Sequence, residues 1–292
     1  MLPPKYSSTE NKERVRQEDT ELIRKECIRK NRKLSYLGMP SGEMIDILTW
    51  KEYFERSTAV EIDTDQRNTL ILNIMRNNMQ NKVKVLFGDI EEVLINGKDN
   101  YNNKLEYPYD VIFLDCFGAL LYKGLRRTKA ISCMIEKQKG HSFLLFITFN
   151  LRERKYCKKS ILTVLSKIQN ELYGFYIHDS KLKNIIHGVL EWYKSQKTHD
   201  MYRQKLFVPY YIKTTAEQYG FKAHAYSPIY YLGFNKSPMI HFLFKMLPEY
   251  ESPTKAVSEQ TIIDILNMNI KEAHNKIVFV RKEQAPLLNI KM

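Results

Sequence analysis

Short apolar runs separated by helix-length segments make up the first 150 residues. The runs are rich in β-branched and aromatic residues, as expected of strands, and glycine or aspartate closes most of them. They cover residues 34–38, 57–63, 83–87, 109–114 and 142–148. Because parallel strands joined by helices need right-handed crossovers, this order predicts an α/β fold with a doubly wound, mostly parallel sheet.

The second half of the chain changes character. Residues 221–232 and 239–247 are strand-like, and the six residues between them are too few for a parallel crossover. They therefore predict an antiparallel hairpin that closes the sheet. The stretch of residues 151–205 is basic and has a helical pattern, which indicates a helical insertion.

The chain ends suggest two extensions around a central domain. Residues 8–33 are highly charged, lack glycine and proline, and contain few apolar residues, which predicts an exposed N-terminal helix. We therefore expect an N-terminal helical extension at 1–33, an α/β domain with its basic insertion at 34–250, and a C-terminal extension at 251–292.

The net charge of +13 is concentrated in one part of the chain. Residues 123–205 carry a net +12, whereas residues 34–122 carry −6. A concentrated positive charge favours a nucleic-acid partner, although solvated helix faces would give the same count. The basic residues after the fourth and fifth strands are the candidates to hold phosphates. They are Arg126, Arg127, Arg152, Arg154, Lys155 and Lys158.

Several classes of protein are not expected. No apolar run is long enough to span a membrane, and residues 1–10 lack the apolar core of a signal peptide, so we expect a cytoplasmic protein. The cysteines lie far apart and three histidines lack metal-ligand spacing, which predicts free thiols and no metal site. These residues are Cys27, Cys116, Cys133, Cys157, His178, His187 and His199.

Four residues at the predicted strand ends suit a nucleoside ligand. An open α/β sheet binds its ligand outside the carboxyl ends of the strands. Gly38 allows a close approach of the backbone, and Glu61 can accept hydrogen bonds from ribose hydroxyls. Asp89 would lie near an adenine amino group, and Asp115 would face the reactive end.

At these positions the chain resembles the class I S-adenosylmethionine-dependent methyltransferases, over about residues 34–150 and 206–247. The resemblance implies S-adenosylmethionine as cofactor, and the family's sheet also closes with an antiparallel hairpin. The glycine loop departs from the family pattern, with Tyr36 at a usual acid and Pro40 at a usual glycine. The implied cofactor-binding residues are Gly38, Gly42, Glu61, Ile62, Asp89 and Ile90.

The sequence Asp115-Cys116-Phe117-Gly118 is similar to motifs of methyltransferases that act on base amino groups. The resemblance implies that Asp115 orients an exocyclic amine and that Phe117 stacks on the base. Such a transfer depends on positioning and needs no metal. The alternative is that Asp115 caps a helix and Phe117 belongs to the core. Cys116 is interpreted as an inert thiol rather than a nucleophile.

The expected function is methyl transfer to an amino group of a base in RNA or DNA. Two alternatives stay open. The altered glycine loop is compatible with a non-catalytic methyltransferase-like subunit that binds nucleic acid, inside a larger complex. A glycine loop followed by an acid after the second strand also fits a nicotinamide-dependent oxidoreductase.

Overall fold

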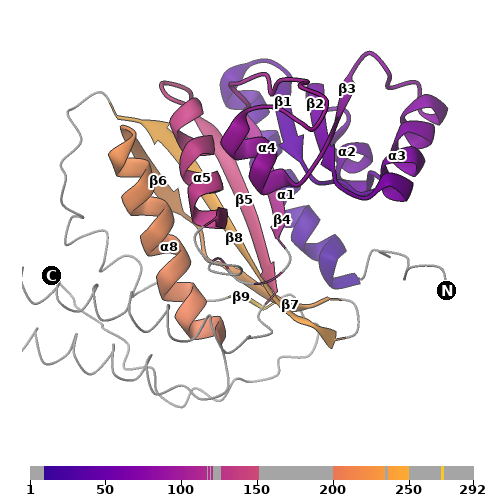
Figure 1. Cartoon of the computed structure of the whole chain (residues 1–292). Helices are drawn as coiled ribbons and strands as arrows, with labels where there is room; N and C mark the ends of the chain where they lie inside the picture. Colours follow the sequence, from indigo (N-terminus) through magenta and orange to yellow (C-terminus); the bar gives the residue numbers. More distant parts are fainter. Residues whose placement is uncertain are drawn as a thin grey trace, which may run out of the picture.

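The fold is known from a computed structural model (Figure 1). It describes residues 10–116, 118, 120, 126–150, 200–233, 236–249 and 271–272. The predictions for Phe117, for the insertion up to residue 199 and for most of the C-terminal extension lie outside the described residues.

Five parallel strands form one half of the sheet, in the order β3-β2-β1-β4-β5. Except in the edge strand β3, their side chains are buried along most of their length, which explains why they appear as near-continuous apolar runs in the sequence. The strands are β1 (Leu34–Gly38), β2 (Phe54–Glu61), β3 (Val83–Phe87), β4 (Val111–Cys116) and β5 (Phe143–Asn150).

The other half of the sheet is antiparallel and is built around β8 (Pro238–Pro248), which pairs with β5. The edge of β8 that faces away from β5 pairs with both β6 (Phe221–Ala225) and β7 (Ile229–Leu232). A two-residue strand, β9 (Lys271–Glu272), runs parallel to β7. The predicted antiparallel closure is thus confirmed.

Helices cover both faces of the sheet, as a doubly wound fold requires (Figure 1). The helices α1 (Glu10–Lys30), α2 (Ile45–Trp50) and α3 (Thr64–Arg76) share one apolar core with one face. The helices α4 (Ile90–Asn96), α5 (Arg126–Lys137) and α8 (Asp200–Gln218) share another core with the opposite face.

The N-terminal helix forms as predicted, but the expectation that it is exposed was wrong. One face of α1 is buried on the sheet, through Val15, Arg16, Asp19, Ile23 and Glu26. Three of these five residues are charged, so the face has no apolar stripe that a sequence pattern could reveal. The helix docks through apolar contacts of Val15 and Ile23 and through polar contacts of its buried charged residues.

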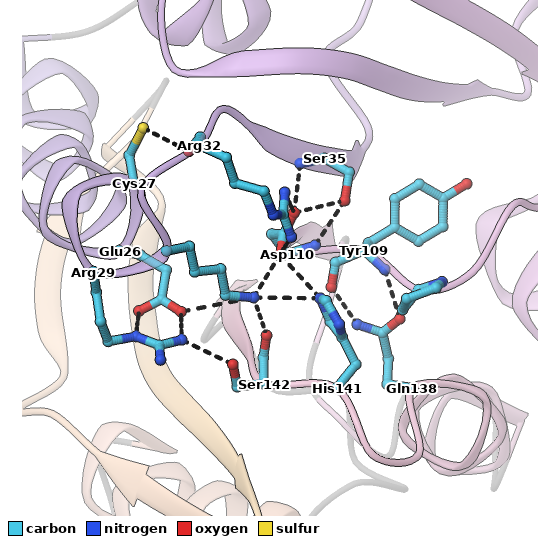
Figure 2. A network of polar contacts seen from close by, with 12 residues as sticks. Glu26, Cys27, Arg29, Arg32, Ser35, Tyr109, Asp110, Gln138, His141 and Ser142 are labelled. Atoms are coloured by element: carbon cyan, nitrogen blue, oxygen red, sulfur yellow. Dashed lines mark hydrogen bonds and ion pairs between the residues drawn. The ribbon is translucent and has the colours of Figure 1, made fainter.

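A cluster of ion pairs fixes the C-terminal end of α1 at the amino edge of the sheet (Figure 2). The buried carboxylate of Asp110 accepts hydrogen bonds from Lys30 at 2.5 Å and from Arg32 at 2.8 and 2.9 Å. Ser35 and His141 also bind this carboxylate. Burial by itself would raise the pKa of Asp110, but these hydrogen bonds hold it well below its usual range.

Candidate functional site

The predicted strand-end residues lie along one edge of the sheet. Gly38 on β1 is in register with Ala59 of β2 and Phe113 of β4, and Glu61 on β2 is in register with Phe87 of β3. The chain order reverses between β1 and β4, so this edge contains the topological switch point. Ligands of open α/β sheets bind at such a point.

Both predicted glycines have an intramolecular reason to lack a side chain. A Cβ on Gly38 would lie 2.0 Å from the hydroxyl of Tyr36, and one on Gly42 would lie 2.8 Å from Gln66. The Gly42 amide donates to Gln66 Oε1 at 3.0 Å, and its carbonyl accepts from Asn73 at 2.9 Å. The loop after β1 is therefore fixed to α3, and its approach to a cofactor stays a prediction.

Tyr36 fills the space above Gly38. Its ring is fully buried and stacks on Phe54, with the edge of Trp50 against it. Its hydroxyl has no hydrogen-bond partner among the described residues. Burial raises the pKa of Tyr36 well above its ordinary value, so the side chain is neutral.

Glu61 is a half-buried carboxylate at the end of β2. Its Oε1 accepts the backbone N–H of Asp63 at 2.9 Å, and burial raises its pKa. The next residue, Ile62, is 59% exposed, which is unusual for a large apolar side chain at a strand end. Asp63 caps α3 by accepting from the amides of Asp65 and Gln66.

An aromatic shelf that the sequence did not reveal lies beside this carboxylate. The shelf consists of Phe87 at the end of β3 and Tyr101, whose rings stack at 5.9 Å. The guanidinium of Arg67, from α3, lies 4.3 Å from the ring centre of Phe87. Tyr101 is 62% exposed. The sequence did not reveal this pair because it forms where the loop before Tyr101 folds back on β3, with the Asn100 amide donating to the Phe87 carbonyl.

Asp89 caps α4 and also binds an arginine. Its Oδ1 accepts the amide of Glu91 at 2.8 Å, and its Oδ2 lies 2.9 Å from Arg126. Arg127 is buried and donates to Glu91 at 2.7 Å. Acids of α4 thus neutralise two of the arginines predicted to hold phosphates.

Of the remaining residues predicted to bind cofactor or phosphate, one is buried and four lie outside the described part of the chain. Ile90 is buried in the core beneath α4. The basic residues at positions 152, 154, 155 and 158 lie outside the described residues. Binding of phosphate or cofactor by this group of side chains therefore stays a prediction.

Asp115 lies near the end of β4, and its carboxylate binds a residue of α1. Lys12 Nζ lies 3.1 Å from Asp115 Oδ2, and both side chains are partly exposed, at 26% and 30%. The neighbouring Cys116 is buried, and burial raises its pKa to about 12. The thiol therefore stays protonated at neutral pH and is a poor nucleophile, which agrees with the interpretation of Cys116 as inert.

After Lys12, the charged residues on the same side of α1 are buried against the sheet. Arg16, one turn further, donates to Asp46 of α2 at 2.6 Å, and both residues are buried. Asp19 lies 2.9 Å from His241 Nε2 on β8. His241 Nδ1 in turn lies 2.8 Å from Thr148 Oγ1 on β5. Sequence analysis missed this polar network because its members come from separate elements.

The Asp19–His241–Thr148 array has the connectivity of a nucleophilic triad, but it is not accessible. Asp19 and His241 are 0% exposed and Thr148 is 1% exposed. A substrate carbonyl cannot reach the Thr148 hydroxyl in this arrangement. Burial raises the pKa of Asp19, and its Oδ2 has no partner among the described residues. The array therefore anchors α1 to the sheet.

The structure also bears on metal binding and on membrane spans. In the part of the chain that it describes, no cluster of three or more histidine, cysteine or acidic side chains could hold a metal ion. No helix among the same residues has the length and apolar character needed to cross a membrane.

No family model and no curated protein matches the chain. Solved structures similar to it include magnesium protoporphyrin IX methyltransferase from Synechocystis PCC 6803, at 9% identity, with 82% of this chain and 90% of that chain covered and a TM-score of 0.42. A putative RNA methyltransferase from Pyrococcus horikoshii is 11% identical, with 82% and 83% covered and a TM-score of 0.43. The functional proposal therefore rests on the residues of the chain itself.

Proposed function

We propose that the protein is an S-adenosylmethionine-dependent methyltransferase that acts on an amino group of a base in nucleic acid. The observation that carries this proposal is the placement of Glu61, Asp89 and Asp115 at the carboxyl ends of β2, β3 and β4, along the sheet edge that contains the switch point between β1 and β4. The antiparallel closure through β8 adds support, because it was expected from the resemblance to class I methyltransferases.

The residues around Glu61 fit an adenosine group. The carboxylate can accept hydrogen bonds from two ribose hydroxyls, exchanging the Asp63 amide for them. The exposed side chains of Ile62 and Tyr101 offer apolar and aromatic surface to a purine. When bound, the cofactor supplies an activated methyl group on its sulfonium.

Asp115 is the residue that we assign to the acceptor. Its carboxylate can accept an N–H of the exocyclic amine, which directs the nitrogen lone pair away from the carboxylate and toward the methyl donor. Phe117 would stack on the base, as the motif resemblance implies. Residues 123–205 carry a net +12, and those of their basic residues that acids of α4 do not neutralise favour a polyanionic substrate.

A second candidate function is nucleic-acid binding without catalysis. One observation favours it: the Tyr36 hydroxyl occupies the space that Gly38 leaves open. Where that space is required for a cofactor, the protein would keep the fold and the basic segment but lack methyl transfer. Cofactor binding therefore separates the two functions.

Calorimetry with S-adenosylmethionine and S-adenosylhomocysteine tests the cofactor site. Loss of hydrogen bonds to the ribose in Glu61→Ala should weaken binding by roughly tenfold or more. Glu55→Ala is the matched control, because Glu55 is an exposed acid on the same strand. Equal affinity of Glu61→Ala and the unmodified protein would remove Glu61 from the site, and no binding by the unmodified protein would favour the second function.

Methyl transfer to total cellular RNA, followed with a labelled cofactor, tests the role of Asp115. The Asp115→Asn side chain keeps its shape but presents an amide donor, so turnover should fall far more than cofactor affinity. Asp65→Asn, at an exposed position of α3, is the control. Phe117→Ala should instead weaken substrate binding by about 1 to 3 kcal/mol. Near-normal turnover by Asp115→Asn would contradict the mechanism and leave the fold assignment unaffected.

A further inference from the structure

The proposed acceptor site contains a cation that belongs to the protein. Lys12 lies in the first turn of α1, and its Nζ lies 3.1 Å from Asp115 Oδ2. The negative charge of Asp115 is the main reason why the pKa of Lys12 is raised, although partial burial opposes it. Lys12 is therefore an ammonium ion at neutral pH, and it offsets the charge of the carboxylate that is to receive the acceptor amine.

The backbone that carries Lys12 is held in place by buried contacts. Arg16 and Asp46 form a buried pair one turn away, and Asp19 binds His241 a turn further along. Thr20 also accepts the indole N–H of Trp50 at 2.9 Å. Separating a buried charged pair is far costlier than separating a partly exposed one. Hence α1 stays docked, and its first turn holds Lys12 beside Asp115.

The Lys12–Asp115 ion pair favours an incoming amine that is neutral over one that is positively charged. A lone carboxylate attracts an aliphatic ammonium more strongly than a neutral amine, because the full charge adds to the hydrogen bond. With the Lys12 ammonium already beside Asp115, a second ammonium meets a like charge at short range. The exocyclic amine of a base is neutral and can donate an N–H to the carboxylate without this repulsion.

We propose that Lys12 is a specificity-determining residue that makes the Asp115 site selective for uncharged amino groups and excludes ammonium groups such as a lysine side chain. This inference rests on the proposed function and narrows its substrate class to neutral aromatic amines. Rejection by a like charge is a common way to gain selectivity where attraction alone would favour the wrong partner.

Two cofactor analogues test the inference without a known substrate. S-adenosylhomocysteine lacks the methyl group and has an uncharged sulfur. Sinefungin carries a primary amine in place of the methylsulfonium, and this amine is charged at neutral pH. The unmodified protein should not bind sinefungin more tightly than S-adenosylhomocysteine. Lys12→Met should raise the affinity for sinefungin by about fivefold or more, the effect of removing one like charge at short range, and leave S-adenosylhomocysteine unchanged.

The controls separate charge from structure. Lys25→Met removes an exposed lysine from the same helix and should change neither affinity, whereas Lys12→Arg keeps the charge and should keep the low affinity for sinefungin. An unchanged ratio of the two affinities in Lys12→Met would overturn the inference, and so would loss of both ligands by that variant alone. Failure of the unmodified protein to bind either analogue would instead overturn the proposed function.

Discussion

Asp110 and Asp115 stand at opposite ends of β4 and differ in how far their charges are neutralised. Asp110 is 1% exposed at its side chain and is surrounded by Lys30, Arg32 and His141. Asp115 is partly exposed and forms its ion pair with Lys12 of α1. The first carboxylate is therefore suited to holding the fold together, and the second is accessible to a ligand.

Replacement of Asp110 should strongly destabilise the fold. Asp110→Asn leaves the cations of Lys30 and Arg32 without their buried partner, which should lower the free energy of unfolding by about 3 kcal/mol or more. Glu106→Gln, which breaks an exposed pair with Lys84, should cost less than about 1 kcal/mol. Urea denaturation of the two variants measures both losses of free energy of unfolding. Similar losses would contradict the role of Asp110 in holding the fold together.

The same carboxylate should make stability depend on pH. The pKa of Asp110 is lowered on folding, so its contribution is fully present above about pH 4, the range of an unfolded aspartate, and is lost as the pH falls further. The difference in stability between the unmodified protein and Asp110→Asn should therefore shrink on acidification. A difference that grows between about pH 5 and about pH 3 would have the wrong sign.

Tyr36 offers a test of a buried hydroxyl. Because this hydroxyl has no partner among the described residues, Tyr36→Phe should leave stability unchanged or raise it by about 1 kcal/mol, as measured by thermal unfolding. Gly38→Ala serves as the contrasting variant, since its Cβ would collide with the Tyr36 ring. Marked destabilisation by Tyr36→Phe would reveal a partner for the hydroxyl.

At the scale of elements, strands were predictable and the docking of α1 was not. The bounds of β1 and β3 match the apolar runs at 34–38 and 83–87, and β1 is buried at every position whereas β3, at the edge of the sheet, is buried only in part. β2 begins at Phe54 rather than Ser57, where Glu55 and Arg56 interrupt the pattern. The buried polar side chains of α1 have partners, Asp46 and His241, that are distant in sequence, and no local pattern encodes such pairs.

The candidate site shows the same division. The strand ends Glu61, Asp89 and Asp115 could be located from the sequence, because parallel strands place their carboxyl ends at one edge. Lys12 could not be assigned to this site, because it is brought there by a helix that precedes the sheet. The Phe87–Tyr101 shelf likewise depends on a loop that folds back on β3.

The buried pair of Asp19 and His241 should show strong coupling. His241→Leu alone leaves a buried carboxylate without its partner and should cost about 3 to 5 kcal/mol, whereas His241→Leu combined with Asp19→Leu should recover much of that loss. Chemical denaturation of the two single variants and the double variant gives the coupling energy. A double variant whose cost equals the sum of the single ones would show that the two side chains do not interact.

At the scale of the whole molecule, charge is distributed unevenly between the strand-rich first half and the segment after β4. Residues 34–122 carry −6 and residues 123–205 carry +12. Since Arg126 and Arg127 are balanced by acids of α4, nucleic-acid binding is expected to depend more on the basic residues beyond Leu151. On the proposed function, this excess of positive charge in the sequence suits a substrate held mainly by its phosphates.

Neutralising two groups of residues tests this division. Replacing Arg152, Arg154, Lys155 and Lys158 with glutamine should weaken RNA binding and reduce the slope of log affinity against log salt by about 0.7 to 0.9 for each phosphate that the variant no longer binds. Replacing Arg126 and Arg127 should change the slope less. Fluorescence anisotropy at several salt concentrations measures both slopes. An unchanged slope in the first variant would identify that group as a solvated surface.

The position of β8 between β5 and the strands β6 and β7 has a consequence for synthesis on the ribosome. β8 is the partner of β5, yet it is separated from β5 by the whole stretch of residues 151–237. At translation rates of about 5–20 residues per second, a nascent chain that has completed β5 waits roughly 5 to 20 seconds for Pro248. During that time the apolar edge of Phe143–Asn150 lacks its antiparallel partner and can template association between chains. Products of premature termination before residue 238 should therefore aggregate rather than fold.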